Sequence, residues 1–199
     1  MRRLATVSSI AVLLAAPALA QTGNPAAMPP GTKEAAPGVP APHQPNQPDR
    51  LFAREAAIGG LAEVELGKLA EQKGQSDAVK AFARRMVGDH GKANERLTAL
   101  AKQDGIGLPT GLDQEHAAMR DKLEGMSGAE FDRAYIQGQV TDHQKTAQLL
   151  EYEIGSGQDR ELKGLASETL PTVLEHLRMA QEAAAQLSGK AAPTSASRG

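Results

Sequence analysis

The sequence contains no cysteine and no tryptophan, and aromatic residues make up 3% of its 199 residues. The absence of cysteine excludes disulfide bonds, thiolate metal ligands, covalently attached c-type haem and a lipid-modified N-terminal cysteine. With few aromatic rings and a net charge of −2, the chain offers neither a stacking platform nor a basic surface. Nucleic acid is therefore not an expected partner. No apolar run is long enough to span a bilayer, so no transmembrane segment is expected after signal cleavage.

Residues 1–20 have the pattern of a secretory signal peptide. The pair Arg2 and Arg3 precedes the apolar residues 4–14, and residues 18–20, Ala-Leu-Ala, match a small-x-small cleavage site. The pattern predicts export by the Sec or the Tat system, to the periplasm of a Gram-negative bacterium. Because there is no cysteine to carry a lipid, the sequence does not support association with the outer membrane.

Composition divides the rest of the chain into a linker, one domain and a tail. Residues 21–48 are rich in proline, glycine, glutamine and asparagine, which predicts a disordered linker. Residues 189–199 are small and polar, which predicts a disordered tail. Residues 49–188 show helical periodicity and lack the alternation typical of strands. We therefore expect one all-α domain over residues 49–188.

Capping residues and glycine stops divide this domain into four long helices and a short one. Ser127 and Glu130 predict a capping box at the start of the third long helix. A Gly59-Gly60 pair inside the first helix is expected to mark close packing against a neighbouring helix. The connections are short except between the second and third long helices, which predicts a four-helix bundle with the short extra helix in that connection. The expected helices span about 49–73, 77–103, 113–123, 127–155 and 159–187.

A Val-x-acid-His pattern occurs three times within the predicted helices, at Val87–His90, Val140–His143 and Val173–His176. At 100° per residue, each histidine falls on the apolar face of its helix. On the first helix, Glu65 falls among the large apolar residues, and Glu63 points to the other side. We therefore expect each long helix to direct one metal-competent side chain into the core. These side chains are Glu65, His90, His143 and His176.

Three imidazoles and one carboxylate suit a single Zn, Fe, Cu or Ni ion. A carboxylate buried in a core also needs a compensating partner, which a metal ion or an imidazolium would supply. Two alternatives remain open: a structural or interaction bundle whose core histidines bind no metal, and a b-type haem held by two of them. Asp89, Asp142 and Glu175 lie about 100° from their neighbouring histidines. They are expected to be solvated or inter-helix charges, or to orient an imidazole on an adjacent helix.

Five segments of the domain occur in an order that resembles a known family. They are Glu63–Ala70, Phe82–His90, Phe131–Tyr135, Asp142-His143 and Leu170–His176. Together they resemble the exported bacterial family catalogued as domain of unknown function 4142, whose members are often labelled outer membrane proteins. The resemblance covers about residues 50–187 and implies a ferritin-like helical bundle.

The sequence departs from the ferritin-like di-iron pattern at the position three residues before each histidine. Di-iron proteins use Glu-x-x-His on two helices, whereas Val87, Val140 and Val173 occupy these positions here. The bridging carboxylates are therefore missing, and ferroxidase or oxygenase chemistry is not expected. We interpret the chain as a helical bundle that binds one metal ion; the missing carboxylates argue against an enzyme, and enzymatic activity is left open. Its protein partners and oligomeric state are left open.

Overall fold

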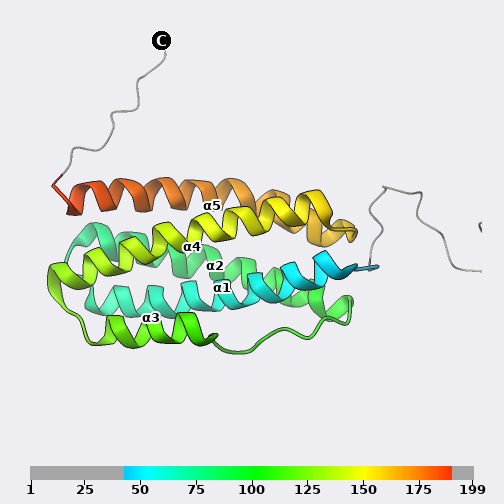
Figure 1. Ribbon diagram of the computed structural model, residues 1–199, viewed down its shortest axis with the longest axis horizontal. Helices are drawn as coiled ribbons and strands as arrows, with labels where there is room; N and C mark the ends of the chain where they lie inside the picture. The colour runs from blue at the N-terminus through cyan, green and yellow to red at the C-terminus, as the bar shows by residue number, and fades with distance from the viewer. Residues whose placement is uncertain (1–42, 190–199) are drawn as a thin grey trace, which may run out of the picture. The chain divides into compact units, whose positions relative to one another are not determined.

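The computed structural model describes residues 43–189, which contain five helices (Figure 1). They are α1 (Gln47–Lys73), α2 (Asp77–Gln103), α3 (Gln114–Glu124), α4 (Gly128–Ser156) and α5 (Arg160–Leu187). The prediction of four long helices and one short extra helix is confirmed. The predicted signal peptide, most of the predicted linker and nearly all of the predicted tail lie outside the described residues.

The four long helices pack as an antiparallel bundle. Helices α1 and α5 lie diagonally opposite each other, and each packs against both α2 and α4. Short turns join α1 to α2 and α4 to α5, whereas residues 104–127 cross back along the bundle and include α3 (Figure 1). Helices α2 and α4 therefore run in the same direction. A long crossover of this kind is the connection found in ferritin-like bundles.

Side-chain caps determine where most of the helices begin. At α1, Asn46 Oδ1 accepts a hydrogen bond from the backbone N–H of Asp49 at 2.9 Å, and the Asp49 carboxylate accepts one from the N–H of Asn46. These bonds satisfy backbone donors that the first helical turn leaves unpaired. The predicted capping box at Ser127 is not formed, because Ser127 makes no side-chain cap hydrogen bond. The other capping side chains are Ser76, Asp113 and Asp159.

The segment just before α1 is attached to the end of the bundle. The His43 ring donates from Nδ1 to Asp104 Oδ1 at 2.8 Å. The backbone N–H of Gln44 donates to Asp159 Oδ2 at 3.2 Å. Residues 47–48 already belong to α1. Of the residues predicted as linker, 43 and 44 thus contact the end of the bundle, and 47–48 form the start of α1.

Two apolar clusters fill the bundle, one toward each end, and the histidines lie between them. On α2, His90 separates Met86 of one cluster from Leu97 of the other. The same order holds on α4, around His143, and on α5, around His176. Each histidine sits near the middle of its helix. The core is therefore divided at mid-length by a polar layer. Among the described residues, no helix is both long and apolar enough to cross a membrane.

The two glycines of the Gly59-Gly60 pair on α1 have different surroundings. A Cβ atom at Gly60 would overlap the side chain of Asn94 on α2, so the predicted close packing is confirmed there. A Cβ atom at Gly59 would meet nothing within 4 Å. Close packing against a neighbouring helix therefore does not explain Gly59.

Candidate metal centre

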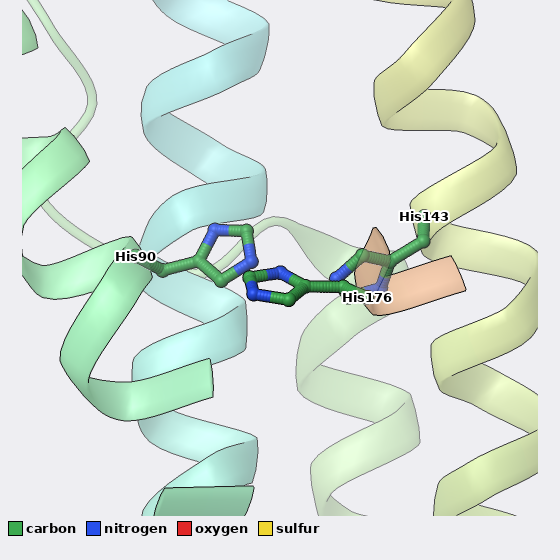
Figure 2. A group of neighbouring side chains, drawn as sticks. All are labelled: His90, His143 and His176. Carbon is green, nitrogen blue, oxygen red and sulfur yellow. The ribbon is translucent and has the colours of Figure 1, made fainter. Parts of the chain in front are cut away.

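Three histidine rings meet in the polar layer of the bundle (Figure 2). His90 comes from α2, His143 from α4 and His176 from α5, and the three residues are 7%, 1% and 1% exposed. The ring centroids are 5.4–5.5 Å apart in all three pairs. One ring nitrogen of each histidine lies within 4.8 Å of one nitrogen of each of the others. The prediction that the three histidines converge in the core is confirmed.

Each ring has one buried nitrogen without a hydrogen-bond partner in the described part of the chain. These atoms are His90 Nε2, His143 Nε2 and His176 Nδ1. The His143 Nδ1–H donates to the carbonyl oxygen of Gln139 at 2.9 Å, and the His176 Nε2–H donates to Asp89 Oδ2 at 3.0 Å. Because both partners can only accept, the remaining nitrogen of each of these two rings carries a lone pair. Metal-binding histidines are commonly oriented by such a bond from the far nitrogen to a carbonyl or carboxylate.

Burial keeps the three imidazoles neutral. Desolvation, reinforced by the neighbouring histidines, lowers the pKa of His90 to about 3 and that of His143 to about 4. Burial also lowers the pKa of His176, although its hydrogen bond to Asp89 opposes this shift. The neutral imidazole is the form that binds metal ions. The centre therefore presents three ligands in the protonation state that a metal requires.

The buried carboxyl group beside the histidines belongs to Glu63. The prediction that Glu65 faces the core is wrong. Glu63 is 4% exposed, and its Oε1 lies 3.5 Å from Nδ1 of His143. The side chain of Glu65 is 47% exposed and accepts a hydrogen bond from Nη1 of Arg120 on α3 at 3.0 Å. Glu65 therefore forms an ion pair with α3 at the surface and lies outside the histidine centre.

The error has a physical cause in the composition of α1. The predicted face was defined by large apolar residues, and three of these, Ile58, Leu61 and Leu69, are only partly buried. The buried stripe consists largely of small residues, which let α1 approach its neighbours closely. Glu63 lies on this stripe, and the spacing of the small residues is the signal that could have identified it. The stripe includes Ala53, Ala57, Gly60, Gly67 and Ala70.

Glu63 is not aligned as a fourth ligand. The histidine nitrogen nearest to it is His143 Nδ1, which already donates to Gln139. Burial raises the pKa of Glu63 to about 8, although a hydrogen bond from Gln139 opposes this shift. Its Oε2 has no partner among the described residues. Glu63 therefore contacts the outer edge of the His143 ring.

The three acids next to the histidines have three different environments. Asp89 on α2 accepts the bond from His176 on α5, so it orients an imidazole on an adjacent helix. The Glu175 side chain is 41% exposed and pairs with Arg178 at 2.7 Å. Asp142 is mostly buried, and its Oδ1 lies 3.9 Å from Lys145 Nζ. The orienting role predicted as an alternative thus holds for Asp89.

Two neighbouring cavities lie beside the centre and share a wall formed by α1 and α4. The first, here called the acidic cavity, has a volume of about 260 Å³ and is lined by His116, Lys145 and five carboxyl side chains. The second, the apolar cavity, has a volume of about 60 Å³ and includes His90 in a mainly apolar wall. The five carboxyl groups belong to Glu55, Glu63, Asp113, Glu115 and Asp142. The residues shared by both cavities are Glu55, Gly59, Thr146 and Leu149.

The fold and the centre define a crossover four-helix bundle with a layer of three buried histidines. Residues 34–183 match the family described as domain of unknown function (DUF4142), and the chain belongs to this family. It is also similar to the crystal structure of a DUF305 fragment from Deinococcus radiodurans. The TM-score is 0.65 at 14% identity, over 73% of this chain and 99% of the fragment, which shows a shared helical fold. No protein with a curated function matches the chain.

Proposed function

We propose that this protein binds a single transition-metal ion through His90, His143 and His176. The observation that carries the proposal is the set of three buried ring nitrogens that have no hydrogen-bond partner among residues 43–189. A buried polar atom without a partner costs about 1–3 kcal/mol. One metal ion would bind all three atoms and remove this cost.

The spacing of the rings suits such an ion. Nitrogens bound at 2.0–2.1 Å in a tetrahedron lie about 3.3–3.4 Å apart. One ring nitrogen of each histidine lies within 4.8 Å of one nitrogen of each of the others, so modest side-chain rotations would bring three nitrogens to that distance. Imidazole ligands without thiolates suit Zn(II), Cu(II), Ni(II) or Fe(II). Because Glu65 is at the surface, a water molecule or an external ligand would complete the coordination.

The residues around the centre favour binding over di-iron oxidation chemistry. Val87, Val140 and Val173 occupy the positions where a di-iron bundle carries carboxylates. Two carboxyl groups contact the centre, Glu63 beside Nδ1 of His143 and Asp89 at Nε2 of His176. Both lie at ring nitrogens that already donate a hydrogen bond, so neither bridges two metal ions. A single ion held by three neutral imidazoles matches this set of side chains better than a bridged metal pair.

Titration of the tag-free chain with Co(II) tests the proposal, because Co(II) bound by imidazoles absorbs visible light. We expect one Co(II) per chain by elemental analysis, with visible bands that saturate at the same ratio. The variants His90→Leu, His143→Leu and His176→Leu keep an apolar core and should each lose most of the affinity. The control His43→Ala removes a histidine at the end of the bundle and should bind normally.

Two results would contradict the proposal. One is wild-type protein that retains far less than one Co(II) per chain. The other is a triple His→Leu variant that binds as tightly as the wild type. Either outcome would favour a bundle in which the histidines are buried polar residues without a metal.

A further inference from the structure

We infer that metal ions reach the histidine centre through the acidic cavity, and that Gly59 keeps open the passage from this cavity to the apolar cavity beside His90. The inference rests on the proposed function and specifies how a hydrated divalent cation would reach that site. It concerns the rates of binding and release, whereas the proposed function concerns the equilibrium.

A buried centre needs a path from solvent. The three histidines are 7%, 1% and 1% exposed, so an ion in solution cannot contact them directly. The apolar cavity has His90 in its wall. The acidic cavity has Glu115 and Lys145 in its wall, and their side chains are 69% and 54% exposed. The four lining residues that the cavities share place them side by side, between the surface of the bundle and the centre.

Gly59 lies where the two cavities adjoin. It lines both of them, and a Cβ atom at this position would meet nothing within 4 Å. A glycine inside a helix costs about 1 kcal/mol relative to alanine. At Gly60 this cost is explained by close packing against Asn94, but Gly59 has no such contact. The lack of a side chain at Gly59 leaves the junction of the cavities open.

The charges of the acidic cavity suit a cation. Two of its five carboxyl groups are paired, Asp113 with His116 at 2.6 Å and Glu115 with Lys145 at 2.5 Å. Glu55 and Asp142 add further negative charge to the wall. Negative groups outnumber Lys145 in this wall. A cleft with such an excess of one sign of charge raises the local concentration of counter-ions and increases their association rate, by about 10- to 1,000-fold in strongly charged cases.

Glu63 links this cavity to the histidines. It lines the acidic cavity, is 4% exposed and has a carboxyl oxygen without a partner among the described residues. Its other oxygen is 3.5 Å from the ring of His143. The carboxyl groups thus extend from the exposed Glu115 to the edge of the centre. An unpaired oxygen at the inner end can receive the cation as it loses water.

Stopped-flow measurements of Co(II) binding to the full chain test the route. The variant Gly59→Leu adds a side chain to the shared wall and should slow association and release by the same factor. Its affinity and its stoichiometry should stay those of the wild type, because the three ligands are unchanged. The matched control is Gly164→Leu on α5, where a Cβ atom also meets nothing and which lines a different cavity. Its rates should be normal.

A second variant tests the charge and does not depend on the first. The double change Glu55→Gln and Asp142→Asn should lower the association rate about tenfold at low salt. The difference from the wild type should shrink in high salt, because salt screens exposed charges.

Wild-type rates in both Gly59→Leu and the double variant would overturn the route while leaving metal binding intact. Failure of the wild-type chain to bind Co(II) would overturn the proposed function, and the route with it.

Discussion

Replacing the buried Glu153 with glutamine should stabilise the protein at neutral pH. Glu153 is 0% exposed, and its two carboxyl oxygens have no hydrogen-bond partner in the described structure. Its carboxyl group lies beside that of Asp49, which accepts hydrogen bonds from the backbone N–H groups of Asn46, Gln158 and Asp159. Burial, and then the neighbouring Asp49, raises the pKa of Glu153 from 4.5 to about 8.

The size of the effect follows from proton linkage. Between pH 4.5 and about 8 the folded protein holds a proton that the unfolded chain has released. Glu153 therefore costs little stability below pH 4.5. As the pH rises from there toward 8, the unfolding free energy falls by about 1.4 kcal/mol per pH unit because of this group. The accumulated loss is below about 1 kcal/mol at pH 5 and about 3 kcal/mol at pH 7. Glutamine is neutral at every pH and brings an N–H group that can donate to Asp49, so Glu153→Gln should recover this amount.

Urea unfolding at pH 5, 6, 7 and 8, followed by circular dichroism with a chelator present, measures the difference. The gain in unfolding free energy of Glu153→Gln should rise between pH 5 and pH 7 and level off near pH 8. Glu151→Gln, an exposed change on the same helix, is the control and should show no such trend. A gain that is the same at every pH, or a loss at pH 7, would refute the reasoning.

Three further predictions concern the centre and its surroundings. Asp89→Ala removes the acceptor that orients His176, so Co(II) affinity should fall about 10- to 100-fold in a titration while stoichiometry stays at one; unchanged affinity would deny Asp89 this role. Glu65→Gln should leave the affinity measured by calorimetry unchanged, and a clear loss would restore Glu65 as a ligand. Gly59→Ala should raise the unfolding free energy by up to about 1 kcal/mol, whereas Gly60→Ala should raise it less, because the new Cβ atom would displace the side chain of Asn94. Equal effects of the two glycine changes in urea unfolding would contradict the packing described for the pair.

The helices and their approximate bounds could be predicted because their signals are local. Ser76, Asp159 and the glycine after Lys73 mark ends by chemistry that acts within one helical turn. The inward direction of the histidines was also predictable. On α2, α4 and α5 large apolar residues surround each histidine at helical spacing, so the wheel identifies the buried face correctly.

Helix α1 could not be predicted in the same way, because its buried face is composed mainly of small residues. Hydrophobicity alone ranks Leu61 and Leu69 above Ala57 and Gly60, although the two small residues are the buried ones. The choice between Glu63 and Glu65 therefore depended on which helix faces approach closely, which is a tertiary property.

Contacts between helices were also beyond the sequence. The bond from His176 to Asp89 depends on the axial register of α5 against α2, and no local pattern determines this register. The two cavities depend in the same way on how α1 and α4 pack against each other and against the other helices. The sequence could offer an orienting role for Asp89, and only as an alternative.

Because three different helices contribute the three histidines, metal binding at the centre depends on tertiary packing. His90 and His143 are 53 residues apart in the chain, and His143 and His176 are 33 apart. The α1–α2 hairpin carries only His90, and the α4–α5 hairpin carries only His143 and His176. A compact state that keeps native helices but loses fixed side-chain packing retains its far-ultraviolet circular dichroism. In such a state the visible absorption of bound Co(II) would disappear while the helical signal persists. The protein would therefore release its ion when side-chain packing is lost, before the helices unfold.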